Sequence, residues 1–119
     1  QAEAGDRVGC NLEAIQEIQK IINEKQGHFL LVMTPLLREI GEPGSLDYEQ
    51  KARRRLSDFT QNEHITYIDF LPIFKLAEQP ETLYRDSIHL SPTGNQTVSE
   101  SISEAISQLL RQQELGTED

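Results

Sequence analysis

Apolar and polar residues alternate in blocks along the chain, and the spacing within each block indicates its structure. Over residues 11–26 the apolar side chains recur every three or four positions, which predicts a helix with Asn11 as its N-cap and Gly27 as its C-terminal stop. Its apolar stripe consists of Leu12, Ile15, Ile18, Ile21 and Ile22. Residues 28–33 are apolar at every position after His28, and Thr34-Pro35 ends the run. This pattern predicts a strand buried on both faces, as in a parallel sheet covered by helices.

A second helix and a second strand follow the first pair. After a loop rich in Gly and Pro, Asp47 with Gln50 resembles a capping box and precedes a further helical stripe. That stripe consists of Tyr48, Ala52, Leu56 and Phe59. Residues 65–70 are rich in β-branched and aromatic side chains, which predicts a second buried strand with Asp69 as its only acid. A short helical or irregular stretch (residues 71–77) and a polar loop (residues 78–86) come next.

The last helix has the clearest start signal in the chain. Ser91 is the predicted N-cap and Pro92 the first helical residue, and the apolar stripe continues to about Arg111. Its members are Val98, Ile102, Ile106, Leu109 and Leu110. The polar ends of the chain, residues 1–10 and 112–119, are expected to be flexible.

Strands that alternate with helices predict an α/β fold with a parallel sheet, whose ligand site lies beyond the carboxyl ends of the strands. The 119 residues are enough for one domain, yet an isolated pair of strands is marginal. The first residue is Gln1 rather than Met. We therefore expect a single domain or part of a larger one, with an exposed sheet edge through which copies of the chain associate.

The composition excludes several classes of protein. With 20 acidic and 11 basic side chains the formal net charge is -9, which argues against nucleic acid or an anionic membrane as the main partner. The single cysteine, Cys10, permits neither an internal disulfide nor a zinc module. The longest apolar run, residues 29–33, is too short to span a bilayer, and no signal peptide is visible, so the compartment stays open.

The segment most suggestive of chemistry is the loop before the last helix, which places Asp86 three residues ahead of His89. A histidine that acts as a general base needs a carboxylate to hold its tautomer and stabilise its charged form. The alternative is structural: Asp86 and Ser91 serve as loop and cap residues, and His89 is a partly buried packing residue. Spacing alone favours this alternative, because Asp-x-x-His is a short pattern that arises by chance.

Residues 84–100 resemble the C-terminal block of the SGNH (GDSL) hydrolase family, in which Asp-x-x-His precedes Pro-x-Gly and the final helix. The resemblance extends over residues 11–110 and implies a flavodoxin-like three-layer parallel sheet with flanking helices. It also implies that Asp86 and His89 are the acid and base of a Ser-His-Asp triad. The implied substrate is a small-molecule carboxylic ester or an acetylated carbohydrate, with water as the second substrate and no cofactor.

The family's nucleophile and oxyanion-hole motifs do not occur in the sequence. Gly5-Asp6 is followed by Arg7 instead of a serine, and Gly94-Asn95 lies after the histidine. We therefore expect the chain to be the C-terminal part of such a hydrolase, lacking the serine block. Ser87 is not expected to replace that serine, because adjacent loop side chains rarely converge in the required geometry. The alternative function is a non-catalytic α/β remnant or interaction module.

The remaining polar groups have simpler interpretations. His28 and His64 each precede a strand, at the end opposite the expected site, so a metal site is not expected. The three arginines of residues 53–55 are interpreted as a solvated helix face, and Cys10 as a small, partly buried residue. The apolar side chains of residues 36–39 either line an acyl pocket or pack under their loop, and packing is the commoner case.

Overall fold

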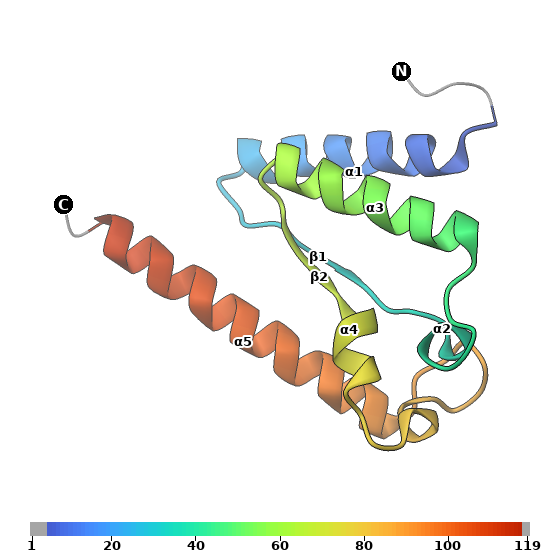
Figure 1. Cartoon of the computed structure of the whole chain (residues 1–119). Coiled ribbons are helices and arrows are strands. Elements are labelled where there is room, and N and C mark those ends of the chain that lie inside the picture. The colour runs from blue at the N-terminus through green and yellow to red at the C-terminus, as the bar shows by residue number, and fades with distance from the viewer. Residues whose placement is uncertain (1–4, 118–119) are drawn as a thin grey trace. The chain divides into compact units, whose positions relative to one another are not determined.

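The predicted alternation of helices and strands is present in the computed structural model, which describes residues 5–117 (Figure 1). In chain order the elements are α1 (Arg7–Glu24), β1 (Leu30–Met33), α2 (Leu37–Ile40), α3 (Asp47–Asn62), β2 (Thr66–Asp69), α4 (Phe70–Lys75), the 3₁₀ helix η1 (Pro80–Leu83) and α5 (Pro92–Thr117). The chain is thus a mixed α/β protein. The sequence did not reveal the two short helices α2 and η1, which lie in segments interpreted as loops.

β1 and β2 pair in parallel, as predicted, with Leu30 opposite Thr66 and Met33 opposite Asp69. Among the described residues the sheet has only these two strands. Every residue of both strands is half-buried, so the expectation of strands buried on both faces is wrong. A strand with one neighbour leaves its other edge open, and the side chains along that edge stay partly accessible.

The chain divides into two units, and the second is discontinuous in sequence. The first unit comprises the described residues up to Thr34 together with Pro43–Asp69; within it α3 packs against β2 and α1 (Figure 1). The second unit comprises Pro35–Glu42 and the described residues from Phe70 onward, in which α2, α4 and η1 contact one another and η1 contacts α5.

The fully buried rings of the chain belong to the second unit. Phe70 and Phe74 have no exposed surface, and their ring centroids are 5.6 Å apart. Tyr84 packs edge-on against Phe74, with 6.0 Å between the centroids. Leu71 and Leu83 complete this small core. Because these rings come from α4 and from the residue after η1, they fix the start of the loop that carries the candidate site.

Helix α1 begins earlier than its sequence pattern predicts. Its N-cap is Asp6, which accepts a hydrogen bond from the Gly9 N–H at 3.0 Å, whereas Asn11 lies inside the helix. The carboxylate of Asp6 also accepts hydrogen bonds from both terminal nitrogens of Arg55 in α3, at 2.9 and 3.0 Å. This hydrogen-bonded Arg55 and the Gly9 N–H lower the pKa of Asp6 to about 2. Residues 7–10, expected to be flexible, are therefore helical.

The last helix extends beyond its predicted end. Ser91 and Pro92 mark its start as expected, and it continues past Arg111 to Thr117. The apolar side chains of Ile106, Leu110 and Leu115 are exposed. Residues 112–117 are therefore helical, while residues 1–4 and 118–119, which complete the expected flexible ends, lie outside the described part. None of the helices within residues 5–117 has the length and hydrophobicity required to cross a membrane.

Helix α3 also starts differently from its expected capping box. The N-cap is Leu46, and its N–H donates to Oε1 of Glu49 at 2.8 Å. Asp47 is the first helical residue, and Tyr48, assigned to the apolar stripe, has 67% of its surface exposed. The reciprocal half of a capping box is therefore present one residue earlier than expected.

A residue that is not glycine adopts the left-handed backbone region two positions after the last residue of α1 and of α3. Gln26 has φ of 59° and His64 has φ of 57°. After α1, the N–H of Gly27 donates to the carbonyl of Ile22 at 2.9 Å, and the N–H of Ile65 closes the equivalent bond after α3. These are Schellman motifs, in which glycine usually occupies the left-handed position. Gly27, the predicted stop, lies one residue after that position.

The three arginines of residues 53–55 do not form one solvated face. Nε of Arg53 lies 2.8 Å from Oδ2 of Asp69 at the end of β2, and these side chains are only 15% and 18% exposed. Arg54 and Arg55 are exposed, as predicted, although Arg55 pairs with Asp6. The half-buried ion pair joins α3 to the carboxyl end of β2, which explains an acid at the end of an otherwise uncharged strand.

Candidate active site

Asp86 and His89 lie on a short loop, residues 84–90, that leads from η1 into α5. An antiparallel bridge between Tyr84 and Leu90 closes the base of the loop, and the N–H of Arg85 donates to the carbonyl of His89 at 2.8 Å. The two ends of the loop are thus fixed by main-chain hydrogen bonds. The intervening residues, including both candidate side chains, form its tip.

The structure brings the predicted acid and base into direct contact. Nδ1 of His89 lies 2.8 Å from Oδ2 and 3.1 Å from Oδ1 of Asp86. Oδ1 also accepts the N–H groups of Ile88 and His89, at 2.9 and 2.7 Å. The Ile88 N–H, followed by the ring and N–H of His89, lowers the pKa of Asp86 to about 2. Asp86 is therefore an ionised acceptor near neutral pH.

This arrangement sets the chemistry open to His89. When Nδ1 carries the ring proton and donates it to Asp86, Nε2 has the free lone pair of a general base. The His89 side chain is 56% exposed and that of Asp86 is 48% exposed. A second reactant can therefore reach the ring. The alternative in which His89 is a partly buried packing residue is wrong.

Ser91 has the structural role that the sequence assigns to it. Its Oγ accepts a hydrogen bond from the Gly94 N–H at 3.1 Å and donates to the carbonyl of Thr82 at 2.6 Å. The hydroxyl therefore caps α5 and ties its first turn to η1. Both interactions engage the same oxygen, so Ser91 is a poor candidate for a nucleophile.

The Pro-x-Gly spacing after His89 has a packing explanation that sequence reasoning missed. A β-carbon on Gly94 would lie 2.0 Å from the carbonyl oxygen of Leu83 and 3.2 Å from Cδ2 of Leu90. The same Leu83 oxygen accepts the Ser91 N–H at 2.9 Å. Gly94 thus lets the first turn of α5 lie directly on η1, at the base of the loop that carries Asp86 and His89.

Ser87 lies between the candidate acid and base, and its contacts involve the main chain. Its carbonyl accepts the N–H of Leu37 at 3.3 Å. Within the described part of the chain, its hydroxyl makes no hydrogen bond to His89. The structure therefore does not pair Ser87 with the base.

The segment of residues 36–39, which either lines a pocket or packs under its loop, forms the start of α2 and packs against α4 and η1. Leu36 and Leu37 are half-buried. Glu39 is 3% exposed, and its Oε2 accepts the Leu36 N–H at 2.7 Å. These contacts support the packing interpretation.

The other candidate side chains do not gather into a site. His28, His64 and Cys10 are all exposed, so the expectation of a partly buried cysteine is wrong. Over residues 5–117 no group of three or more His, Cys, Asp or Glu side chains is arranged to hold a metal ion. His64 has instead a backbone role as the left-handed residue after α3.

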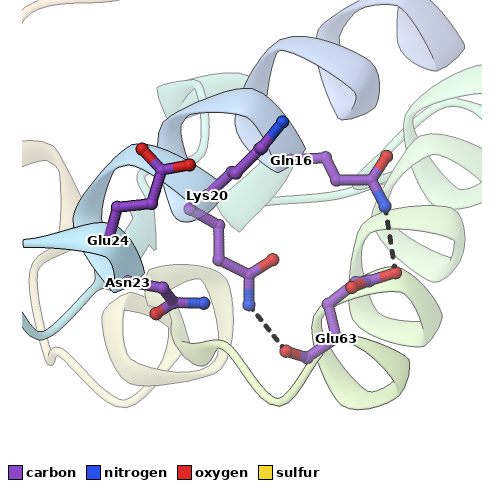
Figure 2. A pocket seen from close by; sticks show the side chains of 6 residues that line it. Gln16, Lys20, Asn23, Glu24 and Glu63 are labelled. Atoms are coloured by element: carbon purple, nitrogen blue, oxygen red, sulfur yellow. Dashed lines mark hydrogen bonds between the residues drawn. The ribbon is translucent and has the colours of Figure 1, made fainter. Parts of the chain in front are cut away.

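A separate depression of about 580 Å³ lies between α1 and the end of α3 (Figure 2). Its lining is polar and consists of Gln16, Gln19, Lys20, Asn23, Glu24 and Glu63. The amide of Gln19 donates to the main-chain carbonyl of Glu63 at 2.8 Å, and that of Gln16 reaches Oε1 of Glu63 at 3.3 Å. The sequence contains no signal for this depression, because its residues match an ordinary solvated helix face. Its hydrogen bonds tie the end of α3 to α1.

No protein-family model matches the chain, and no curated protein or solved structure matches it either.

Proposed function

We propose that the chain carries the general acid–base part of an SGNH-type serine hydrolase that acts on a carboxylic ester or an acetylated carbohydrate. The observation that carries the proposal is the 2.8 Å contact between Nδ1 of His89 and Oδ2 of Asp86, on an exposed loop immediately before α5. The sequence resemblance of residues 84–100 assigns the same two side chains. The resemblance and the geometry thus point to the same pair of side chains.

In the proposed reaction, Nε2 of His89 takes the proton of a serine hydroxyl as its oxygen attacks the ester carbonyl. His89 then passes that proton to the departing alkoxide, which leaves an acyl-serine. Water repeats the sequence, so that the acid product and the free serine are regenerated. Asp86 stays ionised throughout and stabilises the imidazolium that forms in each half of the cycle.

The proposal places the nucleophile and the oxyanion-hole donors outside these residues, because the sequence contains neither the Gly-Asp-Ser nor the Gly-x-Asn-Asp motif. It also takes the parallel pair of β1 and β2 as part of a flavodoxin-like three-layer sheet. The parallel register and the helices that follow each strand support that assignment.

The alternative is a non-catalytic remnant or interaction module. It is favoured by the structural roles of Ser91 and Gly94, which give the final block a packing function independent of catalysis. Such a module would associate through the open edges of the two-stranded sheet, and sedimentation of the chain would reveal the resulting oligomer.

Hydrolysis of p-nitrophenyl acetate tests the proposal. The reading frame upstream of Gln1 is determined, and the extended protein is assayed beside the 119-residue chain. We expect the chain alone to show no turnover that depends on His89. In the extended protein, we expect His89→Ala to lower kcat by about 10²- to 10⁴-fold. His28→Ala is the matched control, because His28 is also exposed and lies in the other unit.

Asp86→Asn tests the acid separately, because asparagine keeps an oxygen that can accept the loop N–H groups while it removes the charge. We expect it to lower kcat of the extended protein with little change in KM. A frame without a Gly-Asp-Ser segment, or an extended protein whose activity is indifferent to His89→Ala, would establish the non-catalytic alternative.

A further inference from the structure

The loop of residues 84–90 is attached to a segment that is distant in sequence. The phenolic hydroxyl of Tyr84 donates to the main-chain carbonyl of Pro35. The N–H of Leu37 donates to the carbonyl of Ser87 at 3.3 Å. One bond holds the base of the loop and the other holds its tip, between the two candidate catalytic side chains. Both partners belong to the Pro35–Glu42 segment of the second unit.

Tyr84 is well placed to act as a permanent anchor. It is 7% exposed and packs edge-on against the buried ring of Phe74. Burial, with a smaller effect from the nearby carboxylate of Glu39, raises the pKa of the Tyr84 hydroxyl to about 12. The hydroxyl therefore keeps its proton and remains a donor to Pro35 across the physiological range of pH.

Leu37 donates from the first position of α2, where a backbone N–H has no partner inside its own helix. The preceding residue, Leu36, has extended backbone angles, and its own N–H is already taken by Oε2 of Glu39. The short helix thus presents the Leu37 N–H to the carbonyl of Ser87. This bond satisfies the Leu37 N–H, which would otherwise have to donate to water.

We infer that Pro35–Glu42 is a positioning strap for the Asp86–His89 loop, with Tyr84 and Leu37 as its positioning residues. The pairing of Asp86 with His89 is local to the loop and needs no strap. What the strap fixes is the placement of that pair relative to the body of the second unit. A role of this placement in catalysis rests on the proposed function. The restraint of the loop by the two hydrogen bonds does not depend on that function.

Two substitutions remove the strap bonds with little other change. Tyr84→Phe keeps the buried ring and deletes only the hydroxyl. Leu37→Pro deletes the N–H together with the leucine side chain. The helix should tolerate it, because proline is favoured at the first helical position and the extended Leu36 suits the residue before a proline. Leu37→Ala retains the N–H and controls for the lost leucine side chain. Asp47→Pro makes the same backbone change at the first position of α3, away from the loop.

Backbone ¹⁵N relaxation on the full 119-residue chain measures the restraint directly. We expect the order parameters of Ser87, Ile88 and His89 to fall from about 0.85 to below about 0.6 in both strap variants and to stay unchanged in both controls. Loss of fold stability alone would not produce a change confined to the loop. Should Tyr84→Phe fail to fold, Leu37→Pro still decides the matter.

Unchanged order parameters in a folded strap variant would overturn the inference, whatever the ester assay shows. Failure of the ester assay alone would leave the strap intact and remove only the function of the loop it holds. If the strap and the proposed hydrolase function are both correct, the strap variants of the extended protein should lose up to about 100-fold in kcat. Small misplacements of a catalytic group have effects of that size.

Discussion

The carbonyl oxygen of Leu83 occupies the position where a side chain on Gly94 would begin, because a β-carbon there would lie only 2.0 Å away. The first turn of α5 can therefore lie on η1 only with glycine at this position. The contact involves main-chain atoms on one side, so no flexible side chain can move to relieve it.

Gly94→Ala should destabilise the chain by about 1–3 kcal/mol, as overpacking of buried sites generally does. The sign of the change in the free energy of unfolding is informative, because an ordinary Gly-to-Ala change inside a helix stabilises by about 1 kcal/mol. Urea unfolding followed by circular dichroism provides the measurement. Asn95→Ala, at the next and exposed position of α5, is the control and should change the free energy of unfolding by less than about 0.5 kcal/mol. A stabilised Gly94→Ala variant would show that the close approach is relieved at no cost.

Glycine substitution should have the opposite effect after α1 and α3. Gln26 and His64 hold left-handed backbone angles that favour glycine, so Gln26→Gly and His64→Gly should each stabilise by up to about 1 kcal/mol. Thermal unfolding compares them with Gln61→Gly, inside α3, which should destabilise by about 1 kcal/mol. If all three variants lost stability equally, the left-handed positions would carry no particular strain.

The half-buried pair of Arg53 and Asp69 should be sensitive to loss of one partner. Arg53→Met keeps much of the side-chain volume but leaves the carboxylate of Asp69 without this cation in a region only 18% exposed. We expect a loss of about 1–3 kcal/mol in the free energy of unfolding, less than for a fully buried pair. The neighbouring Arg54→Met, at an exposed position, should change it by less than about 0.5 kcal/mol. Equal effects of the two substitutions would show that the pair of Arg53 and Asp69 contributes no more to stability than a solvated arginine does.

The pKa of Asp86 can be followed by the ¹³C shift of its carboxyl carbon. Its value of about 2 lies below that of an unfolded aspartate, so the stabilisation from its ionised form is complete above about pH 4 and is lost as the pH falls toward 2. His89→Ala should raise this pKa only part of the way, because the main-chain N–H of Ile88 makes the largest contribution. Asp47, an exposed aspartate at the start of α3, provides the control in the same spectrum. An unchanged pKa of Asp86 in His89→Ala would refute the contact between the two side chains.

Local signals in the sequence predicted the structure best. Ser91 and Pro92 mark the start of α5 because a cap and a first-turn proline act on their own helix. Asp86 and His89 meet as expected, because three residues of one loop separate them. The start of α1 was misplaced, since Asn11 is as good a local cap as Asp6. The partner that distinguishes Asp6 is Arg55, which lies 49 residues away in the chain.

Relationships between distant main-chain atoms could not be predicted from the sequence. The need for glycine at position 94 depends on the Leu83 carbonyl, and the pattern of residue types says nothing about that oxygen. Likewise, the bond from Tyr84 to Pro35 leaves no trace in either segment. These contacts become visible only when the backbone path is known.

That last bond has a consequence for the order of folding. The Tyr84 hydroxyl and the Pro35 carbonyl are 49 residues apart, and the Pro43–Asp69 segment of the first unit lies between them in the chain. Closing so long a loop is entropically costly, and contacts of high sequence separation generally form slowly. During synthesis the Pro35–Glu42 segment emerges well before Tyr84. The second unit therefore cannot form until the residues from Phe70 onward have been made and can pack against that segment.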